Sequence, residues 1–225
     1  MKLRKILLIL PAAIALATSA SAVQINWGSP VDSVFRDSFG NPINETFAIQ
    51  LGYFESVLGV QFHPDFSNMG DWSSHWKVFD QATYNAEDGY FTSSASMDST
   101  GSSDSPFASL GVDFSNEEAY IWIQKPGTSE AGAEWFLGRS DDWVLPEKPA
   151  DNCCDTRVIE WSVSDLEPDG DTPVYGKQGE IKGAGLYTVT GPYTLQTFVV
   201  PEASTSLLLA IGGVAVALRR RRTGI

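Results

Sequence analysis

Phe47-Ala48-Ile49-Gln50-Leu51-Gly52-Tyr53 decides the expected fold, because this stretch alternates apolar residues with small or polar ones. A period of two places successive side chains on opposite faces of a strand. Ile159-Glu160-Trp161-Ser162-Val163 has the same pattern, and residues 120–123 and 193–200 are rich in the aromatic and β-branched types that fit a pleated surface. These four segments are therefore predicted to be β-strands.

Turn signals separate the predicted strands. They are Gly40-Asn41-Pro42, Asp88-Gly89, Lys125-Pro126-Gly127 and Pro168-Asp169-Gly170. Residues 92–106 are mostly Ser, Asp and Gly, and a flexible surface loop is expected there. No long stretch carries an apolar stripe of helical period. The sequence thus predicts an all-β fold, an antiparallel β-sandwich of the jelly-roll type.

The charge of the chain is unevenly distributed. Of 15 basic and 28 acidic residues, 3 basic residues lie within residues 1–22, and 4 basic residues and 1 acidic residue lie within residues 201–225. Residues 23–200 therefore hold 8 bases and 27 acids, a net charge of −19. Phosphate binding needs cationic side chains that release counterions, so this balance argues against a nucleic-acid partner. With 178 residues the segment has the size of one domain.

Residues 1–22 have the three parts of a secretory signal peptide. A basic start is followed by an apolar run over residues 6–17 and by the small-residue cleavage site Ala20-Ser21-Ala22. An uncleaved membrane anchor is the alternative, but 12 apolar residues are fewer than the roughly 20 that a spanning helix needs. We expect the export machinery to translocate the chain and a signal peptidase to cut it before Val23.

A second apolar segment lies at the other end of the chain. Residues 203–218 are 16 residues without a charge, about 24 Å of helix at about 1.5 Å per residue. That length is short for a bilayer, yet arginine side chains can snorkel and the bilayer can thin. Basic flanks stay cytoplasmic, so both ends of the chain place residues 23–200 on the non-cytoplasmic side of the inner membrane. A buried core helix is the alternative, and the four arginines that follow argue against it.

The tail resembles the PEP-CTERM sorting signal of Gram-negative bacteria. The resemblance rests on a Pro-Glu pair, a short apolar helix and a terminal arginine cluster on a chain with a signal peptide. Ala203 stands where the family usually has a second proline. The matching residues are Val200, Pro201, Glu202, Arg219, Arg220, Arg221 and Arg222.

This resemblance implies a membrane-anchored precursor that an exosortase-like transpeptidase processes near the motif. Members of the family commonly become cell-surface or extracellular-matrix proteins where exopolysaccharide is made. The partners that it implies are thus the transpeptidase, inner-membrane lipid and, for the exported domain, exopolysaccharide. It covers about the last 25 residues and implies nothing direct about the rest of the chain.

The seven tryptophans all lie in the acidic segment. Aromatic rings can stack on sugars while neighbouring carboxylates and amides bind the hydroxyl groups. Core positions are the commoner fate of a tryptophan. Trp72, Trp76 and Trp143 stand in polar, loop-like surroundings and are the expected surface candidates for sugar binding.

One acidic stretch has some features of a calcium loop. Asp165, Glu167, Asp169 and Asp171 occupy its first, third, fifth and seventh positions, and a glycine occupies the sixth. Position twelve is Gly176, where a bidentate acid would be needed, and strand-like flanks replace the helices. A solvated acidic turn is therefore the favoured interpretation, with calcium as a weak candidate. No metal or other cofactor is expected.

The only two cysteines are adjacent, Cys153 and Cys154. Their Cα atoms would lie about 3.8 Å apart, below the usual separation in a disulfide. A strained ring, bonds to other chains and two free thiols all stay open. None of these options makes a disulfide scaffold.

Catalytic motifs are scarce. His63 and His75 are the only histidines, and neither a phosphate-binding glycine loop nor a nucleophile elbow is present. With 27 acids some carboxylate pair is inevitable, so such a pair does not indicate a glycosidase. We expect a non-enzymatic surface or biofilm-matrix protein. The alternatives are a carbohydrate-binding module that acts on exopolysaccharide and a secreted glycan-active enzyme.

Overall fold

The computed structural model describes residues 21–125, 133–150, 157–166, 173–183, 185, 187–191 and 193–201. Several predictions fall outside these residues: residues 1–20 of the signal peptide, including Ala20; both cysteines; and the sorting tail from Glu202 onward with its apolar helix and Arg219 to Arg222. Ser21 and Ala22 of the predicted cleavage site are described, and Ala22 is the first residue of a β-strand. The part of the chain that is described contains no helix long and apolar enough to cross a membrane.

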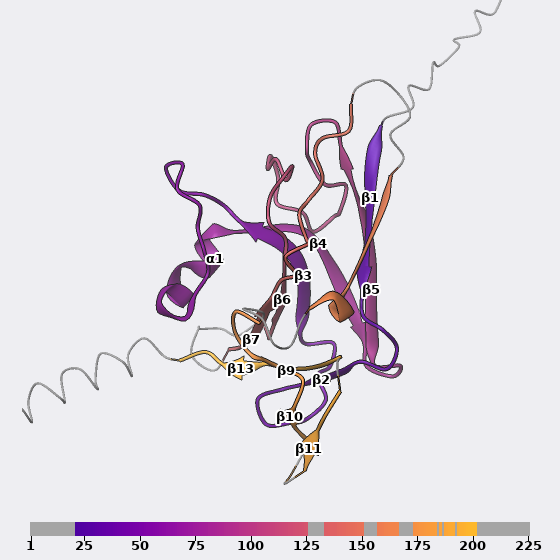
Figure 1. Cartoon of the computed structure of the whole chain (residues 1–225), viewed down its shortest axis with the longest axis vertical. Helices are drawn as coiled ribbons and strands as arrows, with labels where there is room; N and C mark the ends of the chain where they lie inside the picture. The colour runs from indigo at the N-terminus through magenta and orange to yellow at the C-terminus, as the bar shows by residue number, and fades with distance from the viewer. Residues whose placement is uncertain are drawn as a thin grey trace, which may run out of the picture.

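Strands dominate the described chain, as predicted, and helices are few and short (Figure 1). The strands are β1 Ala22–Gly28, β2 Val34–Arg36, β3 Ala48–Phe54, β4 Trp76–Asn85, β5 Tyr90–Asp98, β6 Tyr120–Gln124, β7 Glu134–Gly138, β8 Val158–Ser162, β9 Lys177–Gln178, β10 Ile181–Lys182, β11 Thr188–Val189, β12 Thr194–Gln196 and β13 Phe198–Val199. The helices are η1 Phe66–Asp71, α1 Trp72–His75 and η2 Val163–Asp165.

Eight strands form one curled sheet in the order β13-β7-β6-β3-β4-β5-β1-β8. Small sheets, β2-β12-β9 and β10-β11, lie below it in Figure 1. Most neighbours are antiparallel, but β1 pairs in parallel with β8, and β12 with β2. The all-β prediction is confirmed at this level, with two parallel pairs that the sequence did not indicate.

The inner core lies between strands of the two halves of the curled sheet. Alternate residues of each strand point into it, so that β3 contributes Ile49, Leu51 and Tyr53. From the far end of the sheet, β1 contributes Ile25 and Trp27. The period-two pattern in the sequence is therefore expressed as one continuous packed interior.

The other face of β3, β6 and β7 is also covered. Residues between those of the inner core point outward and form a second group of buried side chains, the outer aromatic cluster. The chain between β3 and β4, which includes η1 and α1, packs over it at the left of Figure 1. Its buried members are Phe54, Met69, Trp72, Trp76, Tyr120, Trp122, Ala133, Trp135, Leu137, Tyr175 and Val200.

A bulge between β3 and β4 lets the two strands contribute side chains to both the inner core and the outer aromatic cluster. The pairing shifts from Leu51↔Asp80 to Gly52↔Val78, which leaves one extra residue in β4. A Cβ on Gly52 would lie 2.2 Å from the Lys77 carbonyl oxygen, so only glycine allows this close approach.

Two local predictions are wrong in part. Residues 92–98 belong to β5 and pair with β1, with Ala95 and Met97 buried, because every second residue of this polar stretch is small or apolar enough to face the core. The expected strand 193–200 divides into β12 and β13, which belong to different sheets. Thr197 lies at the break, where its hydroxyl donates to Glu134 Oε2 (2.8 Å) and its N–H donates to the Arg36 carbonyl.

A candidate ligand-binding groove

An open groove of about 490 Å³ lies where the parallel strands β1 and β8 end. Trp27 pairs with Trp161 in the ladder, and Gly28 pairs with Ser162. The loop after β1 and the start of β5 complete the walls. The lining residues are Asn26, Trp27, Gly28, Ser29, Pro30, Thr92, Glu160, Trp161, Ser162 and Asp165.

The tryptophans of the groove are held in fixed positions. Trp27 Nε1 donates to Asp80 Oδ2 (2.8 Å), and the other oxygen of this buried carboxylate accepts from the Ser105 hydroxyl (2.6 Å). Trp161 stacks on Trp143, with ring centroids 5.6 Å apart. Both lining tryptophans are largely buried, 3% exposed for Trp27 and 8% for Trp161, so only a small part of each residue is accessible from the groove.

Asp165 has a structural role at this site. Its Oδ2 accepts from Trp143 Nε1 (3.1 Å) and from the Ser162 N–H (2.8 Å), and the Ser162 hydroxyl accepts from the Ser164 N–H at the start of η2. This reciprocal cap fixes the turn that follows β8. The remaining calcium candidates, Glu167, Asp169 and Asp171, lie outside the described residues. No group of three or more His, Cys, Asp or Glu that could hold a metal is found within the described ranges.

Hydroxyl, amide and carboxylate groups supply the chemistry of the groove. Asn26, Glu160 and Ser162 come from the outward faces of β1 and β8. The described lining residues include no histidine, cysteine, lysine or arginine. Such a set can exchange hydrogen bonds with a hydroxylated ligand, while the small accessible part of the two tryptophans offers a limited apolar contact.

The expected exposure of three tryptophans is wrong. Trp72, Trp76 and Trp143 are 0%, 9% and 2% exposed, so their rings are not presented for stacking on a sugar. Their polar neighbours are the reason that they could be buried: Asn68, Gln50 and Asp165 accept their indole N–H groups at 2.7, 3.0 and 3.1 Å. Trp27 and Trp161 line the groove instead, and neither was among the expected sugar-binding residues.

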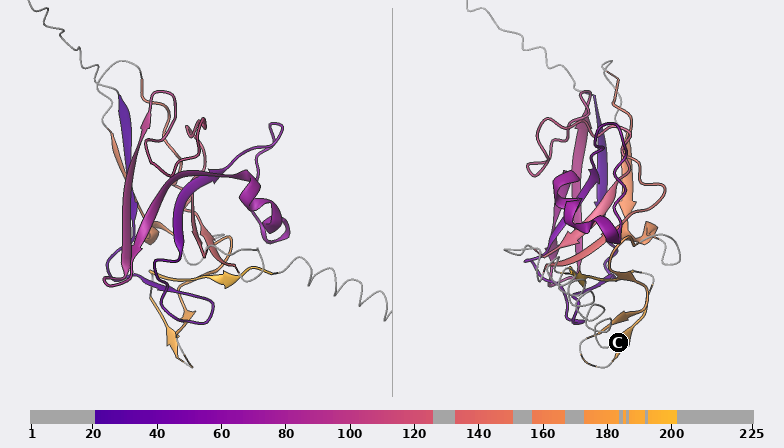
Figure 2. Two further views of the ribbon diagram at one scale, coloured as in Figure 1. Left: turned by 180° about the vertical axis from the view of Figure 1, so that it is seen from behind. Right: turned by 90° about the vertical axis from the view of Figure 1, so that its left-hand side faces the viewer.

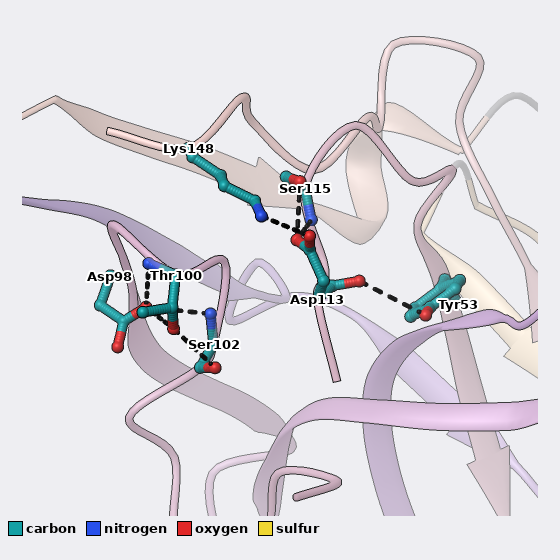
Figure 3. A network of polar contacts seen from close by, with 7 residues as sticks. All are labelled: Tyr53, Asp98, Thr100, Ser102, Asp113, Ser115 and Lys148. Carbon is teal, nitrogen blue, oxygen red and sulfur yellow. Dashed lines mark hydrogen bonds and ion pairs between the residues drawn. The ribbon is translucent and has the colours of Figure 1, made fainter. Parts of the chain in front are cut away.

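A second set of polar residues lies at the rim of the inner core (Figure 3). Asp98 Oδ1 accepts from the N–H groups of Thr100 and Ser102 at 2.8 and 3.0 Å. Burial would raise the pKa of the Asp98 carboxyl, but these hydrogen bonds outweigh burial and lower it. The carboxylate therefore stabilises a turn.

Asp113 has a similar role in the neighbouring loop. It accepts from the Ser115 N–H (3.1 Å) and pairs with Lys148 Nζ (2.5 Å), as Figure 3 shows. Burial again opposes these contacts, and the net effect lowers the pKa of Asp113. The Tyr53 hydroxyl donates to the backbone carbonyl of Asp113. Burial is the largest cause that raises the pKa of Tyr53 to about 12, and nearby acids are the second. The network ties two loops to the core, and each acid in it already has a structural partner.

The comparisons with known proteins give no further direction. Neither the family models, the curated proteins nor the solved structures include a match to this chain.

Proposed function

We propose that the chain is an exported, non-enzymatic surface or extracellular-matrix protein, held and sorted by its C-terminal tail. The acidic β domain, of sandwich type, lies outside the inner membrane in this proposal. A signal peptidase removes the residues before Val23, and an exosortase-like transpeptidase acts near Val200, Pro201 and Glu202. Residues 203–218 span the lipid until then, and Arg219 to Arg222 stop the transfer.

The observation that carries the proposal is the way in which the β domain ends. Val200 is buried, and its N–H donates to the Ala133 carbonyl (2.8 Å). The next residue, Pro201, is exposed and has no N–H that could extend the sheet. The hydrogen bonds of the described β domain therefore reach the residue before the Pro-Glu pair, and exposed Pro201 supports processing there by an enzyme beside the membrane.

Cell fractionation with C-terminal mass spectrometry tests this function. We expect a membrane pool that retains the tail and a surface or released pool that ends near Pro201. Replacement of Pro201 and Glu202 by alanine should retain the precursor in the membrane. Glu147→Ala, at an exposed site within the domain, is the control. A reporter fused after Val200 that proves cytosolic would refute the proposal.

Glycan binding is the second candidate function, and the groove at the end of β1 and β8 favours it. Exopolysaccharide supplies dense hydroxyl groups, which match the hydroxyl, amide and carboxylate lining. Glu160 is exposed there and pairs in the ladder with Asn26. Glu160→Gln should weaken binding of the native exopolysaccharide by about 10- to 100-fold, since a charged acceptor contributes about 1.5–3 kcal/mol.

Affinity electrophoresis in gels that contain the polysaccharide measures this effect. Glu147→Gln removes the same charge from an exposed site outside the lining residues and should leave binding unchanged. Equal retardation of both variants would exclude the groove as the glycan-binding site. No retardation of the parent protein would exclude the function.

A further inference from the structure

A short apolar hairpin projects from the domain between β3 and η1. Val57 and Val60 exchange two backbone hydrogen bonds, each 2.9 Å long. Leu58 and Gly59 form the tip, and both have positive φ, 51° and 78°. This is the geometry of a two-residue turn with left-handed residues at both central positions. We call residues 56–62 the apolar hairpin.

Leucine is an unfavourable residue for this tip. A bulky side chain in the left-handed region is an outlier, and such turns prefer Asn-Gly or Asp-Gly. Leu58 is also 99% exposed, so it makes no packing contact that would offset the conformational cost. An unfavourable backbone conformation combined with full exposure indicates a role outside the folding of the domain.

The rest of the hairpin shares the apolar character of its tip. Val57 and Val60 are 45% and 70% exposed, and residues 56–62 carry no charge. The base is fixed, because Phe62 stacks on His75 with ring centroids 4.2 Å apart and also packs against Phe54. A rigid base that presents a cluster of exposed apolar side chains differs from a scattered surface leucine.

The hairpin lies on the same side of the molecule as the end of the β domain. In Figure 1 the segment that follows β3 projects at the upper left, α1 lies below it, and β13 runs to the left, toward the end of the described chain. The reverse view of Figure 2 shows the same three elements together on one side. Phe66, in η1 next to α1, is 68% exposed and adds an apolar ring to this side.

We propose that the apolar hairpin dips into the lipid bilayer beside the tail and fixes the orientation of the domain on the membrane. The proposal rests on the proposed function, because residues 203–218 must hold the chain at the membrane. Apolar side chains at a bilayer surface gain by leaving water, as interfacial anchors do. The partner is a zwitterionic lipid surface, because a body of net charge −19 is repelled by anionic lipid.

A second copy of the chain is a less suitable partner than lipid. Two bodies that each carry −19 repel one another. The tail, in contrast, would bring the membrane to the side that carries the hairpin at no further cost of association. Only the lipid surface therefore uses both the apolar tip and the position where the β domain ends.

The full chain, reconstituted in vesicles of phosphatidylcholine and phosphatidylethanolamine, provides the test. A diazirine-bearing aliphatic amino acid replaces either Leu58 or Leu110, and lipid cross-linking is measured by mass spectrometry. Leu110 is a matched control because it is 98% exposed and also precedes a glycine of positive φ, Gly111. We expect about tenfold more lipid adduct from position 58, because burial of one leucine side chain in lipid favours the inserted state by about this factor.

A second variant pair avoids the bulky label. Leu58→Asn creates the favoured Asn-Gly turn, so the domain should fold at least as well as the parent. In the parent chain, vesicles should slow hydrogen exchange of the amides of residues 56–62. That protection should be lost in Leu58→Asn and kept in Leu110→Asn.

Each outcome decides the proposal. Equal lipid adducts at the two positions, or unchanged protection in Leu58→Asn, overturn the hairpin proposal. If the protein still floats with the vesicles in that experiment, the tail anchor itself is not contradicted. Adducts from position 58 to a second protein chain overturn it in favour of self-association. If the full chain does not float with vesicles, the anchor and the hairpin proposal both fail.

Discussion

The inner core and the outer aromatic cluster pack on opposite faces of the same strands, yet they are built differently. Most of the inner core comes from residues of the curled sheet, which contact each other across its two halves. The outer cluster needs a cover from outside the sheet: the segment with η1 and α1, together with Tyr175 and Val200. Sheet pairing thus fixes the first cluster, whereas the second depends on short local motifs such as the Asp65 cap of η1.

The largest contrast is expected between two truncations. Phe136→Ala in the inner core and Trp72→Ala in the outer cluster each remove a fully buried ring and should each cost about 3–5 kcal/mol of unfolding free energy. Hydrogen exchange should separate them. Phe136→Ala should speed exchange throughout the sheet, and Trp72→Ala should do so first between residues 55 and 75. Identical exchange patterns would show that the two clusters form one cooperative unit.

Gly52 tests how strongly the clusters are linked through the shared strands. A methyl group there would overlap the Lys77 carbonyl and approach the Trp76 ring, so Gly52→Ala should cost about 1–3 kcal/mol. Both clusters should weaken together, measured by urea unfolding followed by tryptophan fluorescence. Gly70→Ala, where an added Cβ meets no atom within 4 Å, is the control and should change stability little.

Acid should act mainly at the rim of the inner core. The pKa values of Asp98 and Asp113 are lowered in the folded state, so their contribution is present above the ordinary value of 3.8 and is lost as pH falls through the folded values. Asp113→Asn should lower Tm at neutral pH by about 1–3 °C and reduce the acid sensitivity, because its Lys148 pair is half exposed.

Glu117, at the same rim, has a pKa shifted in the opposite direction to those of Asp98 and Asp113. Burial, then the nearby Asp113 and Glu118, raises its pKa above 4.5, so its stabilising contribution is lost as pH rises through the folded value. Glu117→Gln should therefore raise Tm at neutral pH. Thermal scans at several pH values compare both variants, and a shift of the same sign for both would contradict the assignment.

The smallest effect is expected at the centre of the outer cluster. Trp122 is 1% exposed and its Nε1 has no hydrogen-bond partner among the described residues, although the Trp135 ring lies edge-to-face at 5.0 Å. Trp122→Phe removes this unpaired donor and part of the ring, two effects that oppose each other, so stability should change by less than about 1 kcal/mol. Trp72→Phe, which breaks the hydrogen bond to Asn68, should cost more in the same urea titration.

Strand periodicity predicted much of the fold from particular residues. The alternation around Ile49 and around Trp161 located β3 and β8, and Asp88-Gly89 located the turn between β4 and β5. The same pattern was missed where small residues alternate, in residues 92–98, because serine and alanine carry little hydrophobic contrast. The positions of Trp72, Trp76 and Trp143 were misjudged for a related reason: a polar neighbour can accept a buried indole N–H as well as indicate a loop.

By itself, the sequence determined that the described chain is mostly β and that acidic residues concentrate between two apolar ends, because composition and period two are local properties. Only the tertiary structure decided which faces are covered, where the groove lies and that the apolar hairpin shares a side with the end of the domain. Those features depend on contacts between residues far apart in the chain. Trp27 and Trp161 are neighbours in the ladder only because β1 and β8 pair, and no local pattern encodes that pairing.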